Sequence, residues 1–470
     1  MSKKVVLKIG GSILKNKKSV EQILEILKTY PENPVLVVSA FYGITDKLKQ
    51  SLENLLNEQN ILSKLFDEIS NFKSSLIIDL INDDNIRQAT LDELNTELKS
   101  LRQYLQGIYY IRHIPEKAYD YVLSYGERLS VLVLEGIFKD KGIDTKIVLP
   151  ENAGLITDGI FGKASIDLDA SKKQVAKSFT DNKVYLVPGF YGVSKKQEIT
   201  LLGRGGTDYS AAAFAYCINA QSLDIWKDVN GFMTGDPKHV KNPERIQHLT
   251  YSEAAELAYF GAGILHPRTV EPVRPANIPI KIFNINNINK EHKVQTIIDN
   301  EFSFHPEVSK SVTVDYNTGI LKLQGPGVGY IPGILSEITG TLHLHNINIS
   351  SVITSQIAIN LLIDKDIIDD AYQLINKLNL QVLTNIIVKK DVSLIAVVGN
   401  GMTEAYGVAA RILSAVSEHG INIQLSSIGA SDAVTYLIVD EQDTKKALSE
   451  IHRTLFEKKV KAEINSFVEN

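Results

Sequence analysis

Short segments that are entirely apolar recur through the first part of this 470-residue chain, and helical patterns separate most of them. Residues 5–9 form one, interrupted only by Lys8, and residues 35–38 form another. A strand without alternation of apolar and polar residues is covered on both faces, which is typical of parallel sheets. Further strand patterns, most of them apolar except for one residue, lie at 146–149, 184–187, 199–202, 223–226 and 280–283. We therefore predict an α/β domain with a mainly parallel sheet over residues 1–300.

Residues 46–138 are rich in Leu, Glu, Lys and Ile at helical spacing, and they contain few glycines or prolines. This pattern predicts a long helical block within the α/β domain. A polar, proline-containing stretch at 300–310 is the expected domain boundary.

The remainder of the chain contains a repeat, because IleAsnIle at 347–349 recurs at 421–423. Each copy has a strand, a glycine turn and an amphipathic helix before this motif, and two strands and a second helix after it. The order is that of a β-α-β-β-α-β ferredoxin-like unit. We expect two such domains, at 311–388 and 389–470, and the last strand of the second can pair back onto the first. Each buries little surface alone, so we expect them to pair with each other or with another subunit.

Composition excludes several classes of protein. A net charge of −5 disfavours nucleic acid as a partner, and no apolar run approaches the ~20 residues that span a bilayer. The single cysteine, Cys217, lies in an apolar run, which indicates core packing and a reducing compartment. The first strand begins almost at once, so we expect no targeting peptide and a cytoplasmic protein. The histidines lack metal-ligand spacing, and His343 and His345 fit a solvated helix end.

The segment at 201–210 reads LLGRGGTDYS, an apolar strand followed by three glycines around Arg204 and Asp208. Glycine lets the backbone approach a ligand closely, and arginine can donate two parallel hydrogen bonds to a carboxylate or phosphate. This pattern predicts a site for a small anionic molecule at the end of a strand. A glycine turn with a surface ion pair is the plainer alternative for these residues alone.

Other motifs carry charges or hydroxyls where strands end. KIGGS at 8–12 places Lys8 in a buried strand, where an ammonium needs a partner unless it reaches solvent at an edge. SYGERLS places Glu127 at the expected opening of an apolar helix, as a helix cap or as the acceptor of a substrate ammonium. The charged residues in the loops after residue 226 could bind a ligand, or these loops could be ordinary solvated turns. The chain has no P-loop, no dinucleotide-binding GxGxxG helix start and no protein-kinase DFG motif.

Taken in order, eight motifs resemble those of the aspartate kinases, members of the amino-acid kinase superfamily that carry a C-terminal pair of ACT domains. The motifs are KIGGS, VVSAFYGIT, SYGERLS, PGFYG, LLGRGGTDYSAA, IWKDVNGFMTGDP, YSEAAELAYFGAGILHPRT and IPIKIFN. The resemblance implies an αβα sandwich followed by two ferredoxin-like ACT domains. It implies phosphorylation of the β-carboxylate of L-aspartate by ATP with Mg²⁺, giving 4-phospho-L-aspartate, the first step towards lysine, threonine and methionine.

The resemblance also assigns roles. It makes Lys8 and Asp208 catalytic, with Lys8 on the phosphoryl group in flight and Asp208 orienting Lys8 and assisting Mg²⁺ placement. It gives aspartate binding to Ser39, Thr45, Glu127, Phe190, Arg204 and Thr207, with Glu127 on the α-ammonium and Arg204 on a carboxylate. It gives ATP binding to Lys8, Gly10, Gly11, Ser12, Lys227, Asp228, Met233, Asp236, Lys238, Gly263 and Ile264. No residues are expected to bind the metal without the nucleotide.

Several positions depart from the usual pattern of these kinases. The first motif is KIGGS where KFGGT is commonest, and Met233 and Lys238 replace a tyrosine and an arginine. Gly263 stands where a lysine is frequent, while Lys227 stands where many members have threonine, as in plant-type members. We hypothesise that Lys227 supplies the missing positive charge near the nucleotide.

The ACT pair implies feedback control by an amino acid, with lysine or threonine as the candidates. Ser350 stands where lysine-sensitive members often have aspartate, so the effector stays open. The resemblance places effector contacts at Val328, Gly329, Asn348, Ser350, Thr354 and Ser355. It also implies a homodimer or a dimer of dimers through the ACT domains, and dimerisation alone is the alternative role of the repeat. The chain carries no homoserine dehydrogenase extension, so a monofunctional kinase is expected.

Two other functions compete with this one. A sister kinase could act on N-acetylglutamate, glutamate or a nucleoside monophosphate, but SYGE and the tandem repeat argue against it. A ligand-sensing protein with a decayed kinase half is the second alternative. The presence of Lys8, Glu127, Arg204 and Asp208 argues against decay.

Overall fold

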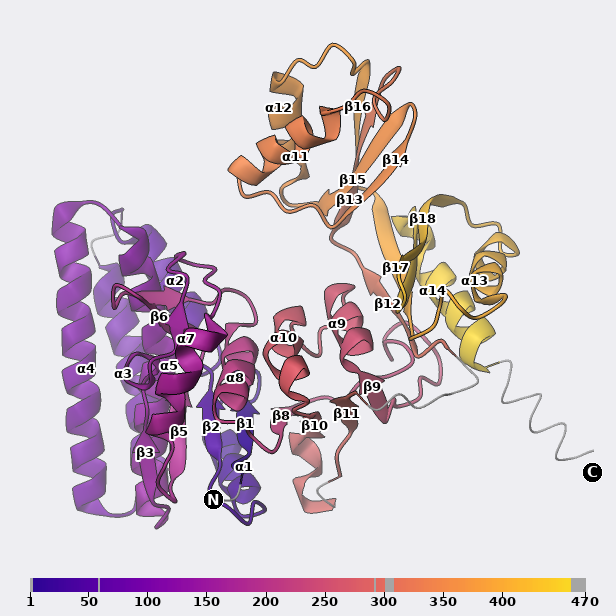
Figure 1. Cartoon of the computed structure of the whole chain (residues 1–470). Helices are drawn as coiled ribbons and strands as arrows, with labels where there is room; N and C mark the ends of the chain where they lie inside the picture. Colours follow the sequence, from indigo (N-terminus) through magenta and orange to yellow (C-terminus); the bar gives the residue numbers. More distant parts are fainter. Residues whose placement is uncertain (1–2, 58–59, 291–292, 301–307, 458–470) are drawn as a thin grey trace, which may run out of the picture. The chain divides into compact units, whose positions relative to one another are not determined.

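The computed structural model describes residues 3–57, 60–290, 293–300 and 308–457, and the chain divides into two compact units (Figure 1). The first unit comprises Met1–Phe232, Arg245–Ala255 and Ile264–Phe302, and the second comprises Met233–Glu244, Glu256–Gly263 and Ser303–Asn470. The boundary expected at 300–310 lies largely outside the described residues. Two short segments upstream of it belong to the second unit, which the sequence pattern did not indicate.

An eight-stranded sheet in the order β3-β5-β2-β1-β8-β10-β11-β9 forms the centre of the first unit. The strands are β1 (Val6–Ile9), β2 (Val35–Val38), β3 (Thr145–Ile147), β5 (Val184–Pro188), β8 (Leu223–Lys227), β9 (His248–Thr250), β10 (Ile280–Asn284) and β11 (Thr296–Asp299). Every neighbouring pair is parallel except β10 and β11. All residues of β1 and β2 are buried, as their unbroken apolar character predicted. The prediction of a mainly parallel sheet is confirmed.

Helices cover this sheet as the helical block predicted. They are α1 (Lys17–Leu27), α2 (Ile44–Asn54), α3 (Ile61–Leu80), α4 (Asp84–Ile111), α5 (Glu116–Asp140), α6 (Pro150–Ala153), α7 (Leu168–Val175), α8 (Gly206–Cys217) and α10 (Val270–Val273), while α9 (Tyr251–Tyr259) runs from one unit into the other. Helix α5 packs on β2, β3 and β5 and shares one apolar core with α1 to α4. Helix α8 packs on β1, β2 and β8, with α7 and α10 against it. The layers are those of an αβα sandwich.

One expectation about this block is wrong. Glu127 was expected at the opening of a helix, but α5 begins at Glu116, directly after Pro115. Proline before the first helical residue suits a helix start, because it removes an N–H that would have no partner there. Glu127 therefore lies in the middle of α5, and it cannot act as an N-terminal cap.

A three-stranded sheet of β4 (Ile156–Thr157), β6 (Tyr191–Ser194) and β7 (Ile199–Leu201) completes the first unit.

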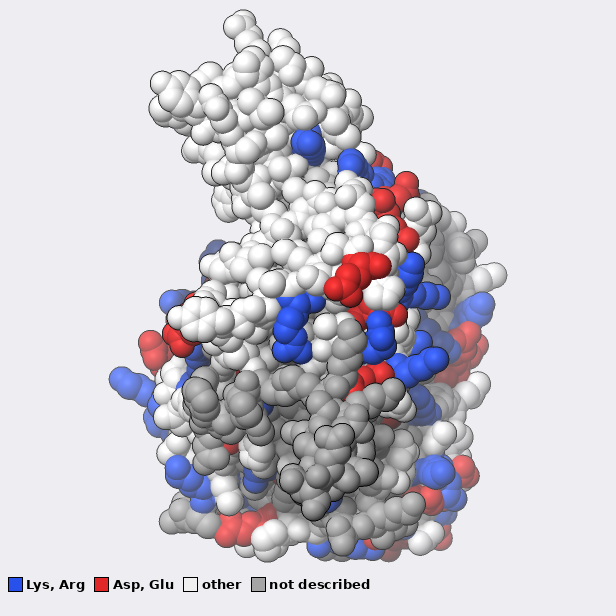
Figure 2. Space-filling model, turned by 90° about the vertical axis from the view of Figure 1, so that its right-hand side faces the viewer, with Lys and Arg blue, Asp and Glu red and all other residues white. Residues whose placement is uncertain are grey.

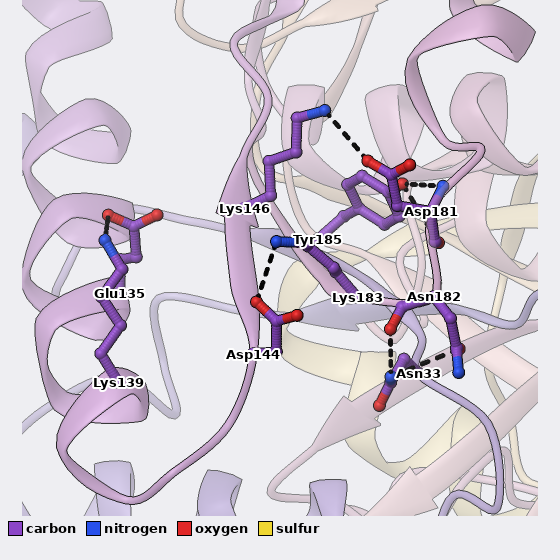
Figure 3. Close-up of polar contacts among 9 residues, drawn as sticks. All are labelled: Asn33, Glu135, Lys139, Asp144, Lys146, Asp181, Asn182, Lys183 and Tyr185. Atoms are coloured by element: carbon purple, nitrogen blue, oxygen red, sulfur yellow. Dashed lines mark hydrogen bonds and ion pairs between the residues drawn. The ribbon is translucent and has the colours of Figure 1, made fainter.

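Polar contacts surround the start of β5 (Figure 3). Lys146 pairs with Asp181 at 3.4 Å, Lys183 pairs with Asp144 at 3.0 Å, and the amide of Asn33 donates to the carbonyl of Asn182 at 2.8 Å. Exposed pairs of this kind contribute little to stability. Their effect is to tie together the loops at the amino ends of the strands, at the edge opposite the one described below.

The second unit contains two four-stranded antiparallel sheets, β14-β15-β13-β16 and β12-β17-β19-β18. The strands are β12 (Ser311–Asp315), β13 (Thr318–Gln324), β14 (Ser351–Ser355), β15 (Ala358–Asp364), β16 (Asn385–Lys389), β17 (Val392–Val398), β18 (Ile423–Ser431) and β19 (Val434–Asp440). The helices are α11 (Ile334–Leu344), α12 (Ile368–Lys377), α13 (Val408–Ser417) and α14 (Thr444–His452). Each copy of the repeat thus forms the ferredoxin-like unit that the sequence predicted.

The strand pairing differs from the expected bounds in one respect. The first repeat was expected to span 311–388, but β12 at the start of that range pairs antiparallel with β17 and so belongs to the sheet of the second repeat. The last strand that was expected to pair back onto the first repeat would fall at 458–470, outside the described residues. His343 and His345 are exposed at the end of α11, as predicted.

Charged side chains are scarce on part of the second unit. Figure 2 shows almost no Lys, Arg, Asp or Glu over the part that carries β13 to β16, on the face turned towards the viewer. Exposed apolar side chains in this part include Val352 on β14 and Ile357 after it. No helix among the described residues is long and apolar enough to cross a membrane.

Candidate active site

Most of the residues singled out in the first unit gather at one edge of its sheet. The strands β5, β2, β1 and β8 are neighbours and run parallel, so their carboxyl ends meet at this edge. Phe190 follows β5, Ser39 follows β2, and Lys227 ends β8. In open α/β sheets, ligands bind outside the carboxyl ends of the strands. We therefore take this edge as the candidate site.

The partner that Lys8 requires is Asp208. The ammonium of Lys8 forms an ion pair with Oδ1 of Asp208, and both side chains are nearly buried. Lys227 approaches the other carboxylate oxygen at 3.9 Å. Burial opposes ionisation of Asp208, but Lys8 and Lys227 outweigh it and hold the pKa of Asp208 below its ordinary value. The site thus carries two ammonium groups around one carboxylate, a net positive charge that suits an anionic ligand.

The glycine loop positions Asp208. Gly205 caps α8 with a φ of 71°, a left-handed conformation that favours glycine. A Cβ on Gly205 would also collide with the ring of His266. Asp208 consequently lies in the first turn of α8, where the helix dipole favours a negative charge. Arg204 lies just before this turn and is exposed, so its guanidinium can reach a ligand.

Glu127 reaches the same edge from α5. Its Oε1 accepts a hydrogen bond of 3.0 Å from the N–H of Ala40, in the loop that links β2 to α2. Its Oε2 has no hydrogen-bond partner among the described residues. Burial raises the pKa of Glu127 to about 8, although the N–H of Ala40 and the ammonium of Lys73 act in the opposite direction. A buried carboxyl with one free oxygen is suited to receive a cationic group.

Ser39 and Thr45 flank that contact. Ser39 donates its N–H to the carbonyl of Ile9 at 3.1 Å, which continues the parallel pairing beyond the strands. Thr45 lies in the first turn of α2, and both side chains are half-buried. The loop between them is fixed further by the hydroxyl of Ser130, which accepts the N–H of Phe41 at 3.2 Å.

Phe190 has an unusual backbone. Its φ is 75°, a left-handed value that costs a bulky residue on the order of 1 kcal/mol or more. Its N–H lies 3.3 Å from the hydroxyl of Ser210, and its carbonyl accepts the N–H of Leu202 at 2.9 Å. Thr207 is buried nearby, since a Cβ on Gly189 would meet its Cγ2 at 2.5 Å. The structure therefore brings Phe190 and Thr207 together beside the glycine loop.

The loop after β1 makes a close turn. The N–H of Ile13 donates to the carbonyl of Gly10 at 3.0 Å, and Ser12 is exposed. A Cβ on Gly10 would lie 3.0 Å from the ammonium of Lys8, and one on Gly11 would lie 3.0 Å from the carbonyl of Ala40. Gly10 thus keeps the space beside the ammonium of Lys8 open, and Gly11 allows the close approach of the backbone at Ala40.

The other residues expected to bind nucleotide are divided between the units. Asp228 and Ile264 lie in the first unit with Lys227, and Asp228 is exposed directly after β8. Met233, Asp236, Lys238 and Gly263 lie in the second unit. Asp236 accepts the N–H of Lys238 at 2.9 Å, so it also shapes a turn.

Thr234 anchors the segment 233–244 within the second unit. Its hydroxyl accepts the N–H of Glu244 at 2.9 Å and lies 3.0 Å from Nε2 of His452, which is buried. Its carbonyl accepts the N–H of Val312 at 2.9 Å. The loop that holds three expected nucleotide contacts is thus built onto the same unit as the repeats.

Two of the expected effector residues, Thr354 and Ser355, lie on the edge strand β14, and the others lie in the loops before α11 and before β14. Gly329 donates its N–H to the carbonyl of Gln356 at 3.2 Å, and a side chain there would collide with the backbone of Ser355. Val328 is buried, whereas Asn348 and Thr354 are exposed at the two ends of the β14 region. Ser350 donates its N–H to the carbonyl of Leu362 at 2.8 Å. The glycine loop before α11 and β14 therefore lie together.

Three residues of the first unit were missed by sequence reasoning. Arg268 donates to the carbonyls of Leu202 and Ala164, each at 3.0 Å, and its guanidinium lies 4.0 Å from the ring centroid of Tyr209. Asp120 accepts the N–H of Leu201 at 2.8 Å. Lys73 lies fully buried on α3. Arg268 stands in the ILHPRT motif and could have been noticed there, but Asp120 and Lys73 carry no local signal.

No group of three or more His, Cys, Asp or Glu side chains that could hold a metal ion is present in the described part of the chain. A Mg²⁺ ion that arrives with a nucleotide takes most of its ligands from phosphates and water. The carboxylate of Asp208, at the centre of the site, is the kind of oxygen donor that such an ion accepts.

Comparison with known proteins agrees with this architecture. Residues 3–284 match the amino acid kinase family, and residues 395–455 match an ACT domain. The bifunctional aspartokinase/homoserine dehydrogenase of Haemophilus influenzae is 30% identical over 97% of this chain and 57% of its own length. The aspartokinase of Saccharomyces cerevisiae is 27% identical over 96% of this chain and 92% of its own length. The chain spans about half the length of the first curated relatives it matches.

Among solved structures, Escherichia coli aspartokinase III in complex with aspartate and ADP superimposes with a TM-score of 0.82. It is 25% identical, and the match covers 96% of this chain and all of that one. The aspartate kinase of Clostridium acetobutylicum, at 23% identity and a TM-score of 0.76, shares the fold. Because the family match extends over most of the first unit and more than half of the chain, the chain belongs to the amino acid kinase family.

Proposed function

We propose that the protein is an aspartate kinase, which transfers the γ-phosphoryl group of ATP to the β-carboxylate of L-aspartate. The products are 4-phospho-L-aspartate and ADP. The observation that carries this proposal is the combination of a buried Lys8–Asp208 pair with a buried carboxyl, Glu127, at one sheet edge. The Lys8–Asp208 pair suits a phosphoryl group, and the carboxyl of Glu127 suits the ammonium of an amino acid. N-acetylglutamate and nucleoside monophosphates lack that ammonium.

The proposed roles follow from charge and position. Lys8 neutralises the phosphoryl group in flight, and Asp208 holds the ammonium of Lys8 in place. Gly10, Gly11 and Ser12 offer backbone N–H groups to phosphate oxygens. Lys227 adds a second ammonium beside Asp208. The attacking β-carboxylate is already an anion, so the transfer requires no general base.

Substrate selection is proposed to rest on the loop and helix residues around Glu127. Glu127 receives the α-ammonium, and Arg204 binds a carboxylate with its paired donors. Ser39, Thr45, Phe190 and Thr207 complete the aspartate pocket. ATP is expected as the phosphoryl donor, since E. coli aspartokinase III was solved with ADP and aspartate. Mg²⁺ would neutralise charge on its phosphates, and Asp208 would be the protein carboxylate that helps to hold the ion.

Regulation is proposed to lie in the two ferredoxin-like domains, at about 311–388 and 389–470, beside a catalytic domain at 1–300. An amino acid, lysine or threonine, would bind along β14 and the glycine loop at Val328 and Gly329. E. coli aspartokinase III was also solved with lysine and aspartate in a T-state. The uncharged face over β13 to β16 supports a homodimer formed through these domains (Figure 2). We propose that the enzyme works in the cytoplasm, in keeping with its free, buried Cys217.

A coupled assay for ADP, with hydroxylamine to trap the acyl phosphate, tests the proposal directly. ATP is offered with aspartate, glutamate, N-acetylglutamate or a nucleoside monophosphate, and only aspartate is expected to give product. Arg204→Ala should raise the aspartate KM by at least about tenfold. Arg274→Ala, at another exposed arginine of the same unit, is the control and should behave as the unchanged protein.

Absence of ADP formation at saturating aspartate would overturn the proposal, as would a preference for another acceptor. An unchanged aspartate KM in Arg204→Ala would remove Arg204 from the pocket. Repeating the assay with lysine, threonine and methionine identifies the effector, and sedimentation of the purified chain gives its oligomeric state.

A further inference from the structure

Lys73 is the most unusually placed cation of the first unit. It lies on α3, which packs against α2 and α5, and none of its side chain is exposed. Its ammonium lies 4.6 Å from the ring centroid of Phe41 and has no hydrogen-bond partner among the described residues. A buried, unpaired ammonium is costly unless another group stabilises it. The ring of Phe41 offers part of that stabilisation, and a negative charge nearby would offer more.

The negative charge comes from Glu127. Burial lowers the pKa of Lys73 to about 7, and the carboxylate of Glu127 is the group that opposes this shift. Glu127 in turn has one oxygen bound by Ala40 and one without a hydrogen bond in the described part of the structure. Tyr191 of β6 is the other titratable group that interacts with Glu127, and burial keeps its phenol neutral by raising its pKa well above the ordinary value. Lys73 and Glu127 therefore titrate as a coupled pair.

Neither group is explained by packing alone. Methionine or leucine would fill the position of Lys73 in this apolar core without the cost of burying a charge. Phe41 follows Ala40 in the loop that binds Glu127, so Lys73 packs against the loop that holds this carboxyl. In the proposed function, the free oxygen of Glu127 receives the α-ammonium of the substrate.

We infer that Lys73 is a positioning residue for amino-acid binding, because its buried ammonium favours the ionised form of Glu127, the form that accepts the substrate's ammonium group. This inference rests on the proposed function. Lys73 touches neither substrate nor nucleotide in this arrangement, and it acts only through Glu127.

The aspartate KM should therefore depend on pH through Glu127. A protonated Glu127 has lost the charge that attracts an ammonium, so the aspartate KM rises as the pH falls below the pKa of Glu127. Lys73 lowers that pKa, while burial raises it. Removing the ammonium therefore raises the pKa of Glu127 further and moves the inflection of the KM profile to higher pH. Since Lys8 and Asp208 contact the phosphoryl group in the proposed function, kcat is not expected to change with the pKa of Glu127.

The test is Lys73→Met, which keeps an unbranched side chain in an apolar core. Steady-state kinetics between about pH 6 and pH 9 should show an aspartate KM about tenfold higher near pH 7, for a rise of about one unit in the pKa of Glu127. The KM should approach that of the unchanged enzyme at higher pH, with kcat and the ATP KM unaltered. Lys64→Met, at an exposed lysine of the same helix, is the matched control and should leave the profile unchanged.

A second comparison separates positioning from general damage. In a Glu127→Gln background, Lys73→Met should cause no further rise in KM, because the group through which it acts is absent. Succinate, which lacks the ammonium, should inhibit the unchanged enzyme and Lys73→Met equally. If Lys73→Met does not fold, as judged by circular dichroism, Lys73→Gln is measured in its place.

The outcomes distinguish the two proposals. An unchanged enzyme that binds no aspartate overturns both. An enzyme that phosphorylates aspartate but shows the same KM profile with and without Lys73 overturns only the role of Lys73. Equal losses of kcat and of succinate binding would also overturn it, since they indicate a purely structural role.

Discussion

Lys8 of β1 and Asp208 of α8 form an ion pair that is almost wholly buried, although they lie in distant parts of the sequence. The pair lies at the end of β1, where the glycine loop places the start of α8 at the edge of the sheet. Each charge depends on the other, because neither side chain has ready access to water. The same two residues therefore stabilise the first unit and, in the proposed function, serve phosphoryl transfer.

Asp208→Asn should destabilise the protein as well as inactivate it. Leaving Lys8 buried without its partner should lower the free energy of unfolding by about 3–5 kcal/mol near neutral pH. The pKa of Asp208 is held below its ordinary value, so its contribution is present above the unfolded pKa of about 3.8 and is lost as the pH falls through the folded value. Urea denaturation at neutral and at acid pH measures the difference.

The control for that experiment is Asp181→Asn, which removes the exposed partner of Lys146 (Figure 3). It should change the free energy of unfolding by less than about 1 kcal/mol. Equal effects of the two substitutions would mean that the buried pair does not stabilise the fold.

Gly126→Ala should disturb substrate binding through a single methyl group. A Cβ at this position of α5 would lie 2.9 Å from Cβ of Ala40 and 3.3 Å from the hydroxyl of Thr45. We expect a loss of about 1–3 kcal/mol in the free energy of unfolding and a higher aspartate KM, because the loop that holds Glu127 must shift. Thermal unfolding and steady-state kinetics measure both.

Gly107→Ala is the matched control, since Gly107 lies within α4 and an added Cβ meets nothing within 4 Å. It should stabilise the helix by up to about 1 kcal/mol and leave the aspartate KM unchanged. An aspartate KM unaffected by Gly126→Ala would contradict the pocket proposed here.

Lys227→Thr tests whether this lysine serves the nucleotide. Its ammonium is 3.9 Å from Asp208, and burial lowers its pKa although Asp208 opposes the shift. Removing it should raise the ATP KM by about tenfold or more with little change in the aspartate KM. Lys196→Thr, at an exposed lysine between β6 and β7, is the control. An unchanged ATP KM would reject the hypothesis that Lys227 compensates for Gly263.

Thr234→Val tests how firmly the second unit holds the segment 233–244. The substitution keeps the size of the side chain but removes the hydroxyl that accepts the N–H of Glu244 and contacts buried His452. We expect a loss of about 1–3 kcal/mol in the free energy of unfolding and a higher ATP KM. Thr339→Val, at a half-buried threonine of α11 whose hydroxyl donates to a carbonyl of its own helix, should change neither. A normal ATP KM in Thr234→Val would show that this anchor does not support nucleotide binding.

The strands and the layer order of the first unit were predictable because the signal is local. A strand such as Val35–Val38 is buried on both faces, and its composition alone records this. The need of Lys8 for a partner was predictable for the same reason, since a charge in an apolar strand is costly wherever the strand lies. The identity of that partner came from a motif in a distant segment.

Other features could not be predicted because they depend on which segments pack together. Glu127 was expected at a helix start, but α5 packs on the sheet and continues through Gly126 without a break. β12 pairs with β17 in the second repeat because its backbone partners are set by tertiary proximity. Lys73 is one of many lysines in a charged helical block, and the packing of α3 against its neighbouring helices makes it a buried residue.

By itself, the sequence determined that the sheet is mainly parallel, where most of its strands form, and which motifs stand at strand ends. These properties depend on the composition and periodicity of short segments. The tertiary structure alone decided that Lys227 approaches the same carboxylate of Asp208 that pairs with Lys8, and that Glu127 interacts with the buried Lys73. Burial and electrostatic coupling depend on distances between segments far apart in the chain, and no local pattern encodes those distances.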